Sequence, residues 1–383
     1  PALLHASGYE TGIFGKWHLG DEDEYQPYNR GFSEVFIHGA GGIGQSYEGS
    51  CADFPPNQAS EGKYFDNVIL HNDTLVQTEG FCTDVFFQAA LGWMKTQLES
   101  DTPFFAYITP NAPHGPMIAP EEYKRRWLDD GWDENTAGRY GMIENIDDNM
   151  GRLMQKLDEW DVWDDTLVIF MTDNGQAGRS GRQNGEPRQM FTAGFKSGKG
   201  SPYEGGSHVP AFWRWKGVLG EGVDITALTA HIDMYQTFCD LADAEIPDGI
   251  HNIDGRSLLP LLEDPNAAWD DRCLFFHTGR WEKGADPNNS QYKSCAVRST
   301  RWRLVNNSIL YDITADPFET TDVAEDHPEI VAELQREFDA WWKATVPLMV
   351  NEDAPYCDHH PQVVRYNEQL EERGIPQWTP PEL

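Results

Sequence analysis

Asp173 and Asn174 follow an apolar run and have the side-chain chemistry of a metal site. Residues 167–171 read Leu-Val-Ile-Phe-Met, and Asp173, Asn174 and Gly175 come shortly after. Such a run is typical of a strand buried on both faces, in the middle of a parallel sheet. Ligands bind at the carboxyl edge of these sheets, and carboxylate and amide oxygens suit a hard cation. The same residues also form a common Asx turn, so the motif alone leaves both interpretations open.

Two other segments hold basic or titratable side chains on a constrained backbone. Lys16 and His18 lie between two glycines, just after a short apolar run. Glycine lets a backbone approach a ligand closely, so this pair suits a phosphate or sulfate oxyanion. His114 has a proline directly before it and another two residues later, which fixes its backbone and suits a catalytic acid. The alternative for both segments is a loop lysine or a buried, hydrogen-bonded histidine.

Hydrophobic periodicity predicts the elements that carry these residues. Apolar runs indicate strands over 11–14, 104–108, 167–171 and 211–215, and helical spacing indicates helices over 1–7, 83–98, 137–160 and 228–242. Residues 21–60 lack helical periodicity and are predicted to be loop, with the Gly-rich stretch 39–42 lining a cleft or forming a turn. The pattern predicts an α/β fold with a mostly parallel central sheet flanked by helices.

The last third of the chain predicts a smaller unit. Short alternating segments indicate an antiparallel sheet with strands over 274–277, 293–298, 302–305 and 309–312. A helix over 328–342 is expected to cover this sheet. Composition shifts near residues 264–271, so we expect domains of 1–268 and 269–383. The acidic, Pro-rich tail over 347–383 is expected to wrap the surface or to be partly mobile.

Charge and cysteine content exclude several classes of function. The 383 residues carry a net charge of −34, which disfavours nucleic acid and anionic membranes as partners. No apolar run approaches the roughly 20 residues that a membrane span needs. The six cysteines include no Cys-x-x-Cys pair, which excludes zinc-ribbon and redox motifs and leaves disulfides open.

Five segments, taken in order, resemble the type I sulfatase family of the alkaline-phosphatase-like superfamily. They are Gly-Lys-Trp-His-Leu-Gly at 15–20, Ala-Pro-His-Gly-Pro at 112–116, Thr-Asp-Asn-Gly at 172–175, the Gly-rich segment 198–210 and residues 310–324. The resemblance covers nearly the whole chain. It implies an alkaline-phosphatase-like fold and a calcium-dependent sulfuric ester hydrolase that acts on a sulfated carbohydrate or an aryl sulfate.

The resemblance also implies roles for individual residues. Asp173 and Asn174 match the later pair of calcium ligands in the family. The groups that hold the modified nucleophile, the sulfate and the leaving-group oxygen match Lys16, His18, His114 and Lys199. In the family a formylglycine hydrate attacks sulfur, so His114 would protonate the leaving group and His18 would help to break the sulfated intermediate. A metal ion and two lysines would stabilise the charge that develops on oxygen.

The family nucleophile is missing from this sequence. It is a cysteine or serine in a Cys-x-Pro/Ala-Ser-Arg motif that is oxidised to formylglycine, and that context is absent around Cys51, Cys82, Cys239, Cys273, Cys295 and Cys357. We expect the motif, with two early calcium-binding aspartates, upstream of Pro1. The chain as given is therefore expected to be inactive, to bind calcium poorly and to expose a sheet edge.

Two other functions compete with this prediction. A phosphatase or phosphonate hydrolase of the same superfamily typically has a histidine after the late aspartate, for a second transition metal, whereas this chain has Asn174. A non-catalytic carbohydrate-binding remnant would fit the missing nucleophile and the 14 tryptophans. That reading leaves the lysines and histidines of the family motifs unexplained.

A basic segment narrows the substrate. Between Gly175 and Gly200 there is a single acidic residue, Glu186, against five basic ones: Arg179, Arg182, Arg188, Lys196 and Lys199. We hypothesise that Arg179, Arg182 and Arg188 bind and focus an anionic substrate, with more benefit to a polysulfated saccharide than to an aryl sulfate. The alternative is an ordinary solvated loop. The acidic composition and the family together predict a periplasmic or secreted protein.

Overall fold

The main sheet is mixed and has five strands. The computed structural model describes residues 1–39, 64–250, 253–349 and 361–383. In spatial order, the main sheet comprises β4 (Thr74–Gln77), β3 (Val68–His71), β2 (Glu34–His38), β1 (Glu10–Lys16) and β5 (Phe104–Thr109). Strand β1 is parallel to β2 and β5, whereas the β2–β3 and β3–β4 pairs are antiparallel. The α/β class is confirmed, with fewer parallel pairs than expected.

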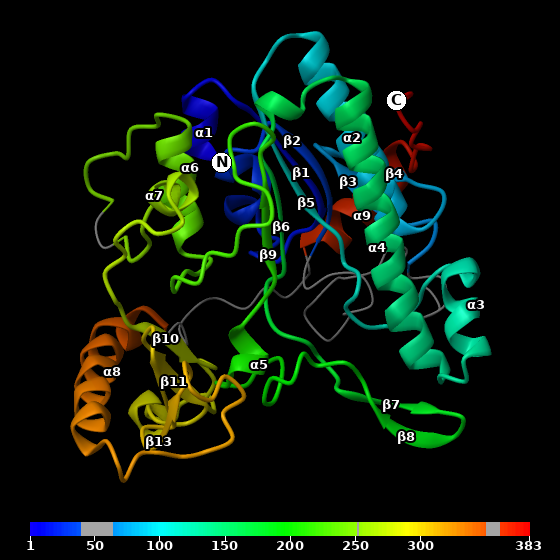
Figure 1. Ribbon diagram of the computed structural model, residues 1–383. Coiled ribbons are helices and arrows are strands. Elements are labelled where there is room, and N and C mark those ends of the chain that lie inside the picture. The colour runs from blue at the N-terminus through cyan, green and yellow to red at the C-terminus, as the bar shows by residue number, and fades with distance from the viewer. Residues whose placement is uncertain (40–63, 251–252, 350–360) are drawn as a thin grey trace.

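Helices cover both faces of this sheet (Figure 1). On one face α2 (Cys82–Glu99) packs on β1, and Phe14 and Phe36 of the sheet pack with Phe86 in the core. Helix α4 (Glu134–Glu159) packs against α2 on the side away from the sheet. Ile13 points to the other face and packs with Tyr366 of α9 (Pro361–Glu372). Successive strand residues face opposite sides, so β1 is apolar because both of its sides are buried. Further helices are α1 (Ala2–Ala6), α3 (Glu121–Asp129), α6 (Asp233–Leu241) and α7 (Leu259–Glu263).

The strand that precedes Asp173 does not lie in the middle of a parallel sheet. Within the described residues, β6 (Val168–Met171) pairs only with β9 (Ala211–Arg214), and that pair is antiparallel. The side chains of β6 are half-buried, and Phe212 of β9 is 67% exposed. The prediction of a central strand buried on both faces was therefore wrong. An apolar run reports burial, but it does not identify the neighbouring strand.

A β-hairpin occupies much of the basic segment. Strands β7 (Ser180–Gln183) and β8 (Glu186–Gln189) pair antiparallel and extend toward α3 (Figure 1). Both turn residues, Asn184 and Gly185, have positive φ, as a type I′ turn requires. The Asn-Gly pair is a strong hairpin signal in the sequence, so this element was predictable although it was expected to be loop.

The small sheet agrees with the prediction. It is antiparallel, in the order β10 (Leu274–His277), β11 (Cys295–Arg298), β12 (Trp302–Val305) and β13 (Ile309–Asp312). Helix α8 (Pro328–Met349) covers one face, where Leu304 and Leu310 pack with Leu334 and Phe338. The other face turns toward the short helix α5 (Glu204–Ser207), which lies between the two sheets in Figure 1.

The end of the chain returns to the main sheet. Gln369 of α9 bonds to both the N–H and the carbonyl of Leu75, at 2.7 and 2.8 Å, and Trp378 packs against Phe36. Residues 361–383 thus wrap the unit that contains the main sheet. The proposed boundary near residue 268 then marks the start of a smaller unit that consists of the small sheet and α8. Among the described residues, no helix is long and apolar enough to cross a membrane. Four described cysteines are free thiols, and Cys51 and Cys357 lie outside the described residues, as do residues 40–42 of the expected Gly-rich turn.

Candidate active site

The loop after β1 presents Lys16 and His18 at the carboxyl end of the strand. Trp17 between them is buried, and its Nε1 donates to the carbonyls of Gly20 and Tyr25, both at 3.1 Å. This anchor turns the neighbouring side chains outward, so Lys16 is half-buried and His18 is exposed. The alternative of a core-facing histidine is therefore wrong for His18.

A close contact between β1 and β5 aligns two of the motifs. Gly15 has φ of 125°, and a Cβ there would lie 2.1 Å from the carbonyl oxygen of Thr109. Only glycine permits this approach. The Thr109 hydroxyl donates to the carbonyl of Lys16 at 2.9 Å. The ends of the two strands are thereby tied together, which brings the segment after β5 next to Lys16.

His114 is held in a rigid turn after β5. Its backbone N–H donates to the Asn111 carbonyl at 2.9 Å, and its own carbonyl accepts from the Tyr64 hydroxyl at 2.8 Å. The ring Nδ1 lies 2.8 Å from the Gly115 carbonyl. Because a carbonyl can only accept, Nδ1 carries a proton in this arrangement, and Nε2 is the nitrogen that can exchange one.

Asp173 and Asn174 lie in the turn after β6. The Asp173 side chain is exposed, and the amide nitrogen of Asn174 donates to the Gly175 carbonyl at 3.0 Å. That bond leaves the amide oxygen as the atom suited to a cation. His231 supports the turn through a 2.7 Å contact between Nε2 and the Thr172 carbonyl. The turn interpretation is confirmed, and because the turn presents two hard oxygen donors, calcium binding by this pair stays a prediction.

The segment that carries Lys199 is docked on this turn. The backbone N–H of Lys199 donates to the Gln176 carbonyl, and the N–H of Gly175 donates to the Gly206 carbonyl, both at 3.0 Å. A Cβ on Gly175 would lie 1.9 Å from the carbonyl oxygen of Gly205. The two segments therefore pack backbone against backbone, which requires glycine.

The charges of five predicted site residues act on one another. Burial lowers the pKa of Lys16, with Asp173 opposing that shift and Lys199 adding to it. Although His18 is accessible to solvent, the surrounding loops desolvate its ring and lower its pKa, and the charges of both lysines lower it further. Burial also lowers the pKa of His114, the bond to Gly115 opposes this, and Lys199 and Lys16 add to it. The structure thus brings together four cationic or titratable groups and one carboxylate.

This balance of charge suits the binding of an anion. Burial and neighbouring positive charge both favour the neutral form of a histidine or lysine. A bound anion reverses the effect, because its negative charge raises the pKa values of the surrounding groups. Within the described residues, no group of three or more His, Cys, Asp or Glu side chains is arranged to hold a metal ion. Asp173 and Asn174 thus fit a hard cation by donor type but supply only part of a ligand set.

The predicted substrate-binding arginines lie on or beside the hairpin and outside this cluster. Arg179 is half-buried and donates to the Phe195 carbonyl at 2.6 Å, so it has a structural bond. Arg182 and Arg188 are exposed. An open groove of about 600 Å³ runs beside the hairpin, and its lining includes Arg188, Gln189, Trp127, Trp132 and Tyr140.

Sequence reasoning missed the residues that hold the site together. Trp17 and Thr109 touch the motifs but were given no role, and the Gly-rich motif was used only for Lys199. Glu204 in the same motif is buried and makes ion pairs with two arginines of the small sheet. A glutamate among glycines, in a segment recognised for its lysine, was the available signal.

Lysines, histidines and a carboxylate–amide pair thus lie on the loops after β1, β5 and β6 and on the segment that carries Lys199, a set of side chains that suits an oxyanion. Comparison with known proteins then identifies the family. The sulfatase family model matches residues 1–244, and the model for the N-sulphoglucosamine sulphohydrolase C-terminal region matches residues 198–343. The chain belongs to the sulfatase family, as the sequence resemblance predicted.

Relatives with curated descriptions agree with this assignment. Human N-acetylgalactosamine-6-sulfatase is 30% identical over 282 residues, which cover 73% of this chain and 50% of the human protein. The uncharacterised sulfatase YdeN of Escherichia coli strain K12 is 27% identical and aligns with 88% of this chain and 65% of its own length. The chain thus spans between half and two thirds of these relatives.

Solved structures share the fold. The carbohydrate complex of Ps i-CgsB with k-i-k-neocarrahexaose superposes with a TM-score of 0.74 at 25% identity, over 97% of this chain and 78% of that one. BT4656, solved with its substrate D-glucosamine-2-N,6-O-disulfate, has a TM-score of 0.60 at 19% identity, over 90% and 81% of the two chains. The latter similarity supports the fold alone.

Proposed function

We propose that the protein is a sulfuric ester hydrolase that removes sulfate from a sulfated saccharide. The observation that carries this proposal is the convergence of Lys16, His18, His114 and Lys199 with Asp173, seen in their mutual effects on pKa. These residues come from the ends of β1, β5 and β6 and from a distant loop. A cluster of cations with one carboxylate suits an ester that is negatively charged before, during and after hydrolysis.

The chain's own residues supply binding and proton transfer in this proposal. Lys16 and Lys199 hold the sulfate oxygens and stabilise the charge that grows on the leaving oxygen. His114 donates a proton from Nε2 to that oxygen, since Nδ1 already donates to Gly115. Desolvation and the charges of the two lysines lower the pKa values of both histidines in the free protein, and a bound anion would raise these values. An anion in the site therefore favours the protonated form of His114 that proton transfer requires.

Asp173 and Asn174 are the residues that would hold calcium. Their oxygens are hard donors, and a calcium ion bound there would supply positive charge next to the sulfate. The formylglycine motif of the family is absent from residues 1–383. We propose that residues 1–383 alone do not turn over substrate, because they lack this motif and, among the described residues, offer only part of a calcium ligand set. Export to the periplasm or beyond is part of the same proposal.

The groove along the hairpin favours a sulfated saccharide over a small aryl sulfate as the substrate. The groove along the hairpin combines Trp127, Trp132 and Tyr140 with Arg188 and amide side chains. Aromatic rings offer apolar area with a polar edge, and arginine pairs well with sulfate. One of the similar proteins, Ps i-CgsB, was solved in complex with k-i-k-neocarrahexaose. These points support a saccharide substrate for this chain.

Sulfate release by the full natural protein tests the proposal. Ion chromatography would follow sulfate from 6-sulfated hexosamines and carrageenan oligosaccharides, with 4-nitrophenyl sulfate and 4-nitrophenyl phosphate as comparison substrates. We expect release from at least one saccharide, slower release from the aryl sulfate and none from the phosphate ester. Phosphate release without sulfate release would instead support the phosphatase alternative, and no release at all would support a carbohydrate-binding remnant.

A further inference from the structure

We propose that three buried charges, Glu204, Arg303 and Glu319, form a positioning cluster that fixes Lys199 and the Asp173–Asn174 turn in place from the small sheet. The catalytic consequence of this inference rests on the proposed function. The structural consequence, that these residues order residues 196–208 and 173–177, does not.

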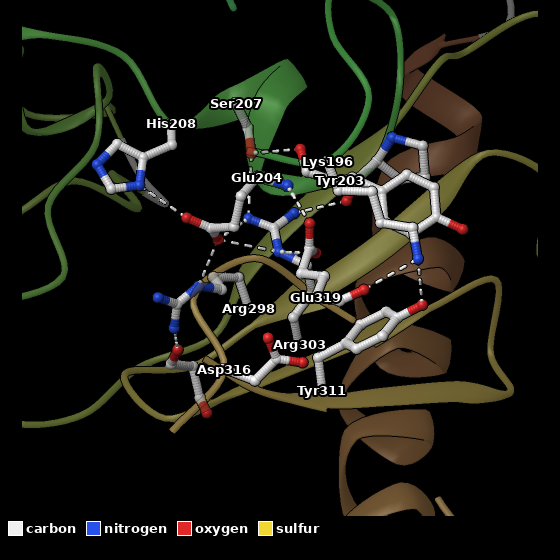
Figure 2. A network of polar contacts seen from close by, with 12 residues as sticks. Lys196, Tyr203, Glu204, Ser207, His208, Arg298, Arg303, Tyr311, Asp316 and Glu319 are labelled. Carbon is white, nitrogen blue, oxygen red and sulfur yellow. Dashed lines mark hydrogen bonds and ion pairs between the residues drawn. The ribbon is translucent and has the colours of Figure 1, made fainter. Parts of the chain in front are cut away.

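Arg303 is the centre of the cluster (Figure 2). It projects from β12 with only 2% of its side chain exposed, and it reaches out of the small sheet into the loop around α5. Its Nη2 lies 2.5 Å from Oε1 of Glu204, its Nη1 donates to the Pro202 carbonyl at 2.6 Å, and Nη2 also donates to the Ser207 hydroxyl at 3.1 Å. One guanidinium thus binds both ends of α5 and Pro202, two residues before the helix.

Glu204 receives further charge from the same sheet. The Nε of Arg298 in β11 lies 2.9 Å from its Oε1, and His208 Nδ1 lies 2.8 Å from its Oε2. Although burial alone raises the pKa of Glu204, His208 and the two arginines hold it well below its usual range. Glu204 therefore stays ionised over the whole physiological range and does not act as an acid or base.

Glu319 fixes the loop around α5 through two further hydrogen bonds. Its carboxylate accepts from the backbone N–H of Glu204 at 2.9 Å, and its carbonyl accepts from Lys196 at 3.0 Å. Lys196 also donates to the Tyr311 hydroxyl at 2.9 Å and lies 4.8 Å from the centroids of the Tyr203 and Tyr311 rings. Glu319 has φ of 58°, a conformation that is costly for a side chain of this size and persists only where its surroundings require it.

The anchored loop transmits this position to the catalytic residues. Gly205 follows Glu204 and donates to the Lys196 carbonyl at 3.0 Å, and a Cβ on Gly205 would lie 2.3 Å from the Ser197 carbonyl. Gly206 in turn accepts from Gly175, next to Asn174. The loop cannot shift locally, because its glycines are in close contact with the backbone of neighbouring segments. A shift of Glu204 must therefore move Lys199, the metal-binding turn or both.

The cluster also explains why charges are used at this place. The small sheet meets the loop around α5 here, and an apolar contact would permit sliding, whereas a forked guanidinium bond fixes orientation. Replacing buried ion pairs by apolar residues often leaves stability intact, so the gain from such pairs is geometric. Position is what a loop carrying a catalytic lysine requires.

Hydrogen exchange of the full natural protein tests the structural claim. Arg303→Lys keeps the charge but loses the forked bonds to Glu204, Pro202 and Ser207. We expect amides over 196–208 and 173–177 to exchange about tenfold faster, because the loop opens more often. The matched control is Leu334→Ala in α8, which weakens the same small sheet without touching the loop. At equal loss of thermal stability, the control should leave these amides unchanged.

Kinetics then test the catalytic claim. In Arg303→Lys we expect kcat for a sulfated saccharide to fall by about 100-fold, as misplacement of a catalytic group predicts, with a smaller change in KM. The control should keep wild-type kcat below its melting temperature. Glu319→Gln retains the acceptor for the Glu204 N–H and should show an intermediate loss, which provides a second variant if Arg303→Lys does not fold.

The two claims fail separately. If exchange in 196–208 rises equally in Arg303→Lys and Leu334→Ala, the positioning cluster is only part of general stability and the inference is overturned. If exchange rises selectively but kcat is unchanged, the loop is positioned for something other than turnover. If the wild-type protein releases no sulfate, the proposed function fails while the exchange result still decides the structural claim.

Discussion

Two clusters of charged residues share the loop over 196–208, and they differ in their balance of positive and negative charge. The proposed catalytic cluster of Lys16, His18, His114 and Lys199 contains one carboxylate, Asp173, and burial together with the charge of Lys199 lowers the pKa values of Lys16, His18 and His114. The positioning cluster balances Glu204 and Glu319 against Arg298, Arg303 and Lys196. The first has an excess of basic groups that suits an anion, whereas the second pairs most of its charges internally. The difference separates residues that serve a ligand from residues that serve the fold.

The largest expected effect comes from removing the proposed acid in the catalytic cluster. His114→Gln should lower kcat by about 10²- to 10⁴-fold, the usual contribution of a general acid, with little change in melting temperature. His5→Gln on the exposed α1 helix is the control. Equal losses of kcat in both variants, or a large loss of stability in His114→Gln, would remove the distinction between the two clusters.

The same variant gives a pH test. Burial places the pKa of His114 below its ordinary value in the free protein, and catalysis by an acid requires the protonated ring. The wild-type value of kcat/KM should therefore decrease as pH rises through that lowered pKa. This limb should be absent in His114→Gln. A profile that retains the limb would assign it to another group, such as His18.

Calcium binding should respond next most strongly. Asp173→Asn removes the charged donor of the proposed pair, and we expect the affinity for calcium to fall by at least about tenfold, since affinity follows the charge of the ligand set. Isothermal titration of the full natural protein measures this without any substrate. Asp165→Asn, an exposed site before β6, is the control. Unchanged affinity in Asp173→Asn would mean that the turn after β6 is only a turn.

The sequence predicted the strands that precede the candidate site residues better than it predicted how those strands pair. Lys16, His18 and His114 follow strands that were placed within a few residues, because apolar runs end where loops begin. The prediction that β6 lies in the middle of a parallel sheet was wrong, since strand pairing depends on residues that are distant in sequence. The positioning cluster was not predicted at all. Arg303 and Glu204 are 99 residues apart, and a charged residue in an alternating strand normally indicates a solvent-facing position.

The hairpin arginines offer a smaller, salt-dependent effect. Arg179 is occupied by its bond to Phe195, so the sharper variant changes only the two exposed residues, Arg182→Gln with Arg188→Gln. We expect kcat/KM for a sulfated oligosaccharide at low salt to fall by about tenfold, because steering by surface charge is modest and screened. Activity on 4-nitrophenyl sulfate should not change. Unaltered activity on the oligosaccharide at low salt would leave the basic hairpin as an ordinary solvated loop.

The smallest effect should come from Asp133, which joins the hairpin to α4 and supports the fold. Its carboxylate accepts from the N–H of Thr136 at 3.0 Å and from the N–H of Arg182 at 2.5 Å, so it caps the helix and holds β7. Asp133→Ala should lower the free energy of unfolding by about 1 kcal/mol, the usual value of an N-cap, without changing kcat on an aryl sulfate. Asp158→Ala at the other end of α4 should be neutral or slightly stabilising, because a negative charge there opposes the helix dipole.

The pH dependence of that difference identifies the cap as its cause. Partial burial raises the pKa of Asp133, but the bonds from Arg182 and Thr136 outweigh it and depress the pKa below its ordinary value. A depressed pKa means that the stabilisation is present above the unfolded-state pKa and is lost as pH falls through the folded-state pKa. Urea denaturation at neutral and at acid pH should therefore show the gap between wild type and Asp133→Ala closing in acid. A gap that persists in acid would show that the carboxylate charge is not its source, and that Asp133 acts through packing.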